Sequence, residues 1–225
     1  MSPSIREVAL ADAREYFAGR DPEIVIAEGD LVAMVAHEVR GEAGDEYDYF
    51  AFRAARVEDG AVAEVWTNAD EGSAAFGTGR PATDRPVAEV GAGDPAANKV
   101  RVADFFRCVF DAHDPGAVRD FYARGFVQHA RTQPQTVEGM EDFVRAMFPD
   151  GPIPVPEVPD LPAILIVGEG DLVVIASEVP QRSRAGTPYL RTLFDAFRVR
   201  DGRLVEHWTG QDPRNIPRRL DPLGT

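Results

Sequence analysis

The sequence predicts an α+β fold in which helices come first and an antiparallel sheet follows. Two observations predict it. Residues 94–148 carry apolar side chains at helical spacing in three segments, and residues 163–209 form apolar and aromatic runs bounded by Gly and Asp, as strands do. A strongly curved antiparallel or mixed sheet wrapped on helices would enclose one apolar, cone-shaped pocket. A third observation, an internal repeat, indicates that the unit occurs twice.

The helices follow from start signals and apolar faces. Asp-Pro at positions 94–95 and again at 114–115 places an N-cap residue before a proline at the first helical position. The second, short helix is expected to end at Gly125, before an extended segment at residues 126–130. A third helix is expected over about 137–148.

Four strands are expected at 163–167, 172–179, 189–199 and 203–209. The segment before them, residues 149–162, contains six prolines and can be neither a regular helix nor a central strand. It is therefore interpreted as an extended loop along the edge of the domain.

The repeat consists of two matches in the same order. The string EGDLV occurs at residues 28–32 and again at 169–173, an offset of 141. Residues 56–70 align with 198–212 at an offset of 142, with eight of fifteen positions identical. Two matches at nearly one offset predict a duplication.

The copies differ in length, which predicts the domain division. Residues 1–70 form a partial copy, because only twenty-seven residues precede its EGDLV and the first helices of the unit are missing. Residues 71–93 are rich in Gly, Ala, Pro and Thr and are interpreted as a flexible linker. Residues 94–215 form the complete copy.

The last hairpin of the complete copy brings two titratable groups together. With a three-residue loop over 200–202, Asp195 lies opposite His207 on the neighbouring strand, at the spacing of a general acid–base pair. A two-residue loop would shift the register by one and place them on opposite faces. Two alternatives stay open: Asp195 pairing with Arg191 at the surface, and a purely structural His207.

Other residues complete the predicted site. Tyr122, which is expected on the second helix, could supply a phenol to a substrate. The pocket walls are expected to be aliphatic and aromatic, formed by Phe106, Phe143, Met147 and Phe197. The partial copy has Arg53 and Val65 at the positions of Asp195 and His207, so it is predicted to be structural.

The segments FVQHA, at residues 126–130, and FDAFRVRDGRLVEHW, at 194–208, carry a family resemblance. The complete copy resembles the SnoaL-like polyketide cyclase group of the nuclear-transport-factor-two-like superfamily. The resemblance implies that Gln128 and His129 point into the pocket, Gln128 toward substrate and His129 assisting the pair. It also implies dimerisation through the sheet, which two copies in one chain would achieve as an internal pseudo-dimer; a further homodimer stays open.

Composition excludes several classes. The formal net charge of -14 disfavours nucleic acid and anionic membrane as partners. No apolar run reaches the roughly 18 residues of a membrane helix, and the first twenty residues lack a signal-peptide core, so a cytoplasmic protein is expected. The four His lack metal-ligand spacing and no phosphate-binding glycine motif occurs, so neither a metal nor another cofactor is expected.

The leading hypothesis is a cofactor-independent enzyme, with Asp195 and His207 as acid–base pair and His129 assisting. Its substrate would be an apolar carbonyl or polyketide-like compound, and its reaction an aldol-type cyclisation, an isomerisation or a dehydration. The first alternative is a pocket that binds a small molecule without turnover, or a module for dimerisation. The second is an interaction protein whose partial copy is completed by another chain.

Overall fold

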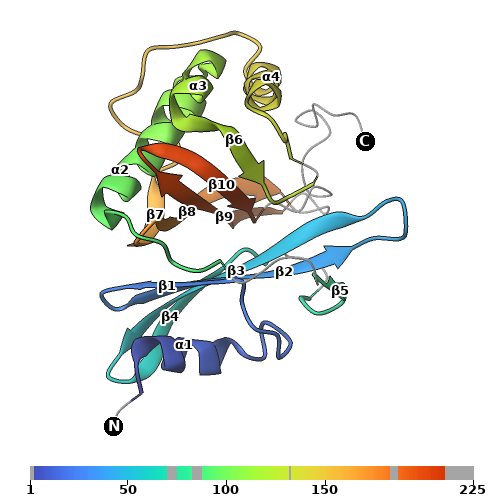
Figure 1. Cartoon of the computed structure of the whole chain (residues 1–225), viewed down its shortest axis with the longest axis vertical. Helices are drawn as coiled ribbons and strands as arrows, with labels where there is room; N and C mark the ends of the chain where they lie inside the picture. The colour runs from blue at the N-terminus through green and yellow to red at the C-terminus, as the bar shows by residue number, and fades with distance from the viewer. Residues whose placement is uncertain (1–2, 70–74, 83–87, 132, 183–186, 211–225) are drawn as a thin grey trace.

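The computed structural model of this chain describes residues 3–69, 75–82, 88–131, 133–182 and 187–210. Its elements form four layers, with helix, sheet, sheet and helices stacked in that order (Figure 1). One helix packs on the outer face of the first sheet, the two sheets face each other, and the later helices pack on the outer face of the second sheet. The predicted α+β class is confirmed.

The first sheet has the strand order β1-β2-β3-β4, and every pair in it is antiparallel. A short fifth strand, β5, pairs with β2. These strands are β1 (Ile24–Glu28), β2 (Leu31–Arg40), β3 (Tyr47–Glu58), β4 (Ala61–Thr67) and β5 (Arg80–Pro81).

The second sheet has the order β6-β10-β9-β8-β7. All four strands predicted for this region are present. The sheet is mixed, because the edge strand β6 runs parallel to β10 while the other pairs are antiparallel. The strands are β6 (Tyr122–Gln128), β7 (Ala163–Glu169), β8 (Leu172–Arg182), β9 (Pro188–Arg200) and β10 (Arg203–Thr209).

The helices are capped as the sequence predicts. Asp94 accepts the N–H groups of the first turn of α2, Asp114 does the same for a short 3₁₀ turn, and Thr136 caps α4. The helical segments are α1 (Ile5–Ala13), α2 (Pro95–Phe105), a π-helical continuation (Phe106–Asp111), a 3₁₀ turn (Pro115–Ala117), α3 (Val118–Phe121) and α4 (Val137–Met147).

The predicted end of the second helix at Gly125 is wrong. That helix, α3, ends at Phe121, and Tyr122 already has extended backbone angles at the start of β6. Pairing with β10 explains the early end, because its ladder satisfies backbone groups that a four-residue helix cannot.

Two apolar layers hold the sheets and helices together. Between the sheets, β1, β2 and β3 pack on β7, β8 and β9, and Phe52 stacks on Phe194 with ring centroids 5.5 Å apart. Beyond the second sheet, Val173 and Ile175 of β8 and Phe197 of β9 pack against α2, α3 and α4. Because side chains alternate along a strand, β8 and β9 supply both layers.

The contacts between the sheets are reciprocal. The Glu28 carboxylate accepts the N–H of Gly168 at 2.9 Å, and the Glu169 carboxylate accepts the N–H of Ala27 at 2.8 Å. Glu169 is the equivalent of Glu28 and Gly168 is the equivalent of Ala27 at the 141-residue offset of the repeat. An interface in which residue i contacts j and the equivalent of j contacts the equivalent of i is the pattern of a two-fold dimer. This supports the predicted duplication and internal pairing, which stay predictions.

The predicted flexible linker is attached to the fold where the structure describes it. Residues 71–74 and 83–87 of that segment lie outside the described residues, as do 211–215 of the predicted complete copy. Of the rest, β5 pairs with β2, the N–H of Ala88 donates to the Glu23 carbonyl, and Gly91 exchanges hydrogen bonds with Asp171. These residues contact both sheets, so they do not form a flexible linker.

We expect Glu28→Ala and Glu169→Ala each to lower the free energy of unfolding by about 1 to 2 kcal/mol. Each removes the acceptor of a partly buried N–H group of the opposite sheet and breaks one ion pair, with Lys99 or with Arg6 respectively. Urea denaturation measures the loss. Glu58→Ala, at an exposed position at the end of β3, is the control and should change stability by less than about 0.5 kcal/mol. Equal stability of all three variants would contradict the reciprocal contact.

Candidate functional site

A cavity of about 440 Å³ lies between the second sheet and the helices that cover it. Its walls are mainly apolar, and a few polar side chains project into it. A volume in this range suits a small organic molecule. The residues that line it include Phe106, Asp111, His113, Tyr122, Gln133, Phe143, Met147, Asp160, Arg191, Asp195, Phe197 and His207.

Asp195 and His207 meet on the wall of this cavity. The His207 Nε2 and the Asp195 Oδ1 are 3.0 Å apart, and each residue is only 8% exposed. The imidazole stacks on the ring of Phe197, with centroids 4.5 Å apart and planes within 3°. The predicted carboxylate–imidazole contact is therefore present and is held in one orientation.

The register that produces this contact differs from the predicted one. The hairpin loop has two residues, Asp201 and Gly202, both with positive φ as a tight type I′ turn requires, so Arg203 pairs with Arg200. A bulge between Leu204 and Glu206 then adds one residue to β10. The three-residue loop was wrong.

The bulge places His207 and Asp195 on the same face of the sheet, whereas the two-residue loop alone would have put them on opposite faces. It brings His207 opposite Phe197, so Asp195 is the diagonal neighbour of His207 on the same face of the sheet. The shorter loop and the bulge compensate each other, so the contact between Asp195 and His207 is retained. The alternative of His207 as a purely structural residue is not favoured by its place on the cavity wall.

Gln128 lies behind His207. It is 4% exposed, and its Nε2 is 2.8 Å from the His207 Nδ1. Its Oε1 accepts the N–H of Ala130 at 3.2 Å. The expectation that Gln128 lines the pocket and binds substrate is therefore wrong: this amide contacts the far side of the imidazole.

His129 lies on the other side of the sheet from the cavity. Its ring stacks on Trp208 at a centroid distance of 4.1 Å, and its Nε2 is 2.9 Å from the Glu206 Oε2. This contact, ahead of the charge of Arg198, lowers the pKa of Glu206. Successive residues of a strand face opposite ways, so Gln128 and His129 could not both approach His207. The expected assistance of His129 at the pair is wrong.

Tyr122 places a phenol in the cavity. Its side chain is 3% exposed, and its hydroxyl has no hydrogen-bond partner within the part of the chain that the structure describes. Burial, and second the charge of Asp195, raise the pKa of Tyr122 above its ordinary value. The phenol thus stays protonated and can donate to an oxygen that enters the cavity.

The four predicted wall residues, Phe106, Phe143, Met147 and Phe197, all line the cavity. Sequence reasoning missed a set of polar residues that line it as well: Asp111, His113, Gln133, Asp160 and Arg191. Burial, ahead of the charge of Asp160, raises the pKa of Asp111. For Asp111 and His113 a signal was available, because the Asp-Pro start at 114–115 requires the preceding helix to end close to them.

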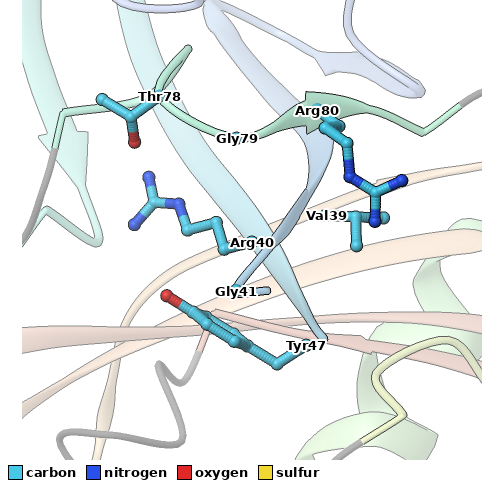
Figure 2. A pocket seen from close by; sticks show the side chains of 7 residues that line it. All are labelled: Val39, Arg40, Gly41, Tyr47, Thr78, Gly79 and Arg80. Carbon is cyan, nitrogen blue, oxygen red and sulfur yellow. The ribbon is translucent and has the colours of Figure 1, made fainter. Parts of the chain in front are cut away.

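Two further features lie on the first sheet. Figure 2 shows a pocket of about 280 Å³ formed by β2, the start of β3 and residues 78–80, in which Arg40 and Arg80 project from opposite sides. The Arg40 guanidinium is bound to Glu38 and covers the ring of Tyr49. At the positions equivalent to Asp195 and His207, Arg53 contacts Asp12 of α1 and Val65 is 39% exposed.

Within the described residues, no group of three or more His, Cys, Asp or Glu side chains is arranged to hold a metal ion. In the same part of the chain, no helix has the length and apolar character needed to cross a bilayer.

Fold and cavity together define a small-molecule pocket domain. Residues 102–207 match the family model of the SnoaL-like domain. The resemblance predicted from FVQHA and the last hairpin is confirmed. No protein of curated function matches the chain.

Several solved structures are similar to part of the chain. TsrD from Streptomyces laurentii is 21% identical, with 58% of this chain and 98% of TsrD covered and a TM-score of 0.40. IdmH from Streptomyces antibioticus, a candidate polyketide cyclase, is 26% identical over 55% of this chain and 98% of IdmH, with a TM-score of 0.33. A candidate SnoaL-like polyketide cyclase from Jannaschia sp. CCS1 is 17% identical over 60% and 98%, with a TM-score of 0.40. These TM-scores are too low to carry an inference about activity.

We expect Tyr122→Phe to raise the free energy of unfolding by about 1 kcal/mol, because it removes a buried hydroxyl that makes no hydrogen bond to the described residues. Urea denaturation measures the change. Tyr16→Phe is the matched control: the Tyr16 hydroxyl donates to the Phe52 carbonyl at 3.0 Å, so its loss should destabilise the protein by a similar amount. Destabilisation of both variants to the same degree would show that the Tyr122 hydroxyl serves the fold.

Proposed function

We propose that the C-terminal unit is a cofactor-independent acid–base enzyme that removes a proton from the carbon next to a carbonyl group of an apolar small molecule. One observation carries the proposal. A buried carboxylate–imidazole pair and a buried phenol, whose hydroxyl has no hydrogen-bond partner among the described residues, line one mainly apolar cavity. Titratable groups that converge in the main pocket, with a donor beside them, are the arrangement expected of an active site.

Asp195 is the base in this proposal. Both nitrogens of His207 are engaged, one with Asp195 and the other with Gln128, so the imidazole has no free lone pair for substrate. Asp195 itself lines the cavity. The substrate C–H bond breaks, an O–H bond forms on the Asp195 carboxylate, and the electron pair moves to the carbonyl oxygen as an enolate.

Tyr122 stabilises that enolate. Its phenol is protonated and buried, and a donor aimed at developing negative charge in a low-dielectric cavity lowers the barrier. The enolate carbon can then attack a second carbonyl, take the proton back at another position, or expel a β-hydroxyl as water. These outcomes are the aldol-type cyclisation, the isomerisation and the dehydration predicted from the sequence.

The walls favour a ring-bearing, apolar substrate. Phe106, Phe143, Met147 and Phe197 offer flat and flexible apolar surface, and Phe197 also backs the imidazole. A polyketide-like compound with adjacent carbonyl groups combines such surface with acidic C–H bonds. In this proposal the first sheet is structural, because it covers the face of the second sheet that points away from the cavity.

The alternative is a pocket that binds the same class of compound without turnover. The position of His129 outside the cavity favours it, since His129 cannot assist Asp195 and His207 there. The two functions separate in one assay, because a binding protein retains its ligand but does not exchange the proton next to the carbonyl.

The test is deuterium exchange. Cyclic β-diketones and aromatic β-keto esters are incubated with the protein in D₂O, and proton NMR follows the loss of the signal next to the carbonyl. We expect exchange above the buffer rate and a fall of about 10²- to 10⁴-fold in Asp195→Asn, the range for loss of a general base. Asp201→Asn, in the exposed hairpin turn, is the matched control and should keep the full rate.

Some compounds could bind, as seen by line broadening, yet exchange deuterium no faster than in buffer. That result would contradict the proposed enzyme and support a binding protein. Equal rates in the wild-type protein and Asp195→Asn would remove Asp195 from the reaction while leaving the cavity as a site.

A further inference from the structure

The imidazole of His207 lies in a hydrogen-bonded chain that begins at the backbone. The N–H of Ala130 meets the Gln128 Oε1 at 3.2 Å, the Gln128 Nε2 meets the His207 Nδ1 at 2.8 Å, and the His207 Nε2 meets the Asp195 Oδ1 at 3.0 Å. Gln128, His207 and Asp195 are all at least nine-tenths buried. Water therefore has little access to compete for these bonds.

The direction of each bond follows from its first donor. A backbone N–H can only donate, so the side-chain atom of Gln128 that it meets is the oxygen. The remaining amide nitrogen can only donate, so the Nδ1 of His207 must accept and carries no proton. The single proton of the neutral ring is then on Nε2, where it is donated to Asp195.

The opposite orientation of the amide is costly. It would place the NH₂ group of Gln128 against the N–H of Ala130, donor against donor, and leave both groups buried without an acceptor at that contact. Stacking on Phe197 holds the ring plane, and a 180° flip within that plane would take both nitrogens away from Gln128 and Asp195. Fixed partners on both sides of the ring define one tautomer.

We infer that Gln128 is a positioning residue that fixes His207 as the neutral tautomer with its proton on Nε2. This assigns to Gln128 a role that acts through His207. The titratable side chains that line the cavity with His207 are Asp111, His113, Tyr122, Asp160, Arg191 and Asp195.

One consequence rests on the proposed function. Because Nε2 already carries a proton, His207 cannot accept another from Asp195 at that atom. The proton taken from the substrate then stays on the Asp195 carboxylate, available to return to the product. The imidazole orients the carboxylate and donates to it, as the buried third member of a catalytic triad orients its neighbour.

The test reads the tautomer directly. Protein labelled with ¹⁵N at histidine is studied by long-range ¹H–¹⁵N NMR at neutral pH, with His207 assigned by its loss in His207→Gln. We expect one protonated nitrogen, Nε2, and one unprotonated nitrogen, Nδ1, in the wild-type spectrum. A proton on Nδ1, or a doubly protonated ring, overturns the inference without any variant of Gln128.

Gln128→Glu supplies the second arm. A carboxylate at this position still accepts the N–H of Ala130, and its other oxygen accepts from Nδ1–H, so we expect His207 to become doubly protonated and the unprotonated Nδ1 signal to vanish. Gln133→Glu is the matched control: it adds the same charge at another buried residue of the cavity wall and should leave the His207 signals in place. An unchanged His207 spectrum in Gln128→Glu would show that Gln128 is merely structural.

The outcome does not depend on turnover. If the tautomer is as inferred and no carbonyl compound exchanges deuterium, the proposed function fails and the role of Gln128 stands. If exchange occurs and the wild-type tautomer is the other one, Asp195 stays the base and the inference about Gln128 fails.

Discussion

The pairing of β9 with β10 is the constraint on which the site depends, because it decides which side chains face the cavity. Side chains alternate along each strand, so a shift of one residue would turn His207 away from Asp195. The two-residue turn alone would have caused that shift. The bulge between Leu204 and Glu206 adds the residue that brings His207 opposite Phe197. Turn and bulge therefore act together, and neither can be understood without the other.

Because side chains alternate along a strand, two polar networks lie on opposite faces of the second sheet. On the cavity side, Gln128, His207 and Asp195 form a chain within apolar walls. On the other side, His129 and Arg198 both contact Glu206, and Arg198 also binds Asp171, which is 1% exposed. The second network binds the turn after β7 to the last hairpin. Opposite charges are paired there, so the backing of the sheet stays rigid without placing a counter-charge in the cavity.

Periodicity and turn residues were sufficient to predict most of the fold. The helix starts at Asp94 and Asp114 and the four long strands were predicted, because caps, prolines and alternating side chains act locally. The end of α3 was not, since its early stop at Phe121 comes from pairing with a strand some eighty residues further on. For the site, the predicted contact between Asp195 and His207 was correct, although it was derived from a three-residue hairpin loop that the structure does not have. It could not separate Gln128 from His129, because which of two neighbours faces inward depends on the register of β6.

The face-to-face packing of the sheets explains why a chain whose candidate site lies on the second sheet also contains the first sheet. An antiparallel sheet needs an apolar cover on each face that is not in water. Helices and the cavity cover one face of the second sheet, and the first sheet covers the other through the rings of Phe52 and Phe194. In the first sheet, α1 occupies the face that corresponds to the cavity side, with Ala9, Ala13 and Phe17 packed there. Together with Tyr16, Phe17 and Phe76, α1 packs directly on that face, whereas in the second unit a cavity lies between the sheet and its helices.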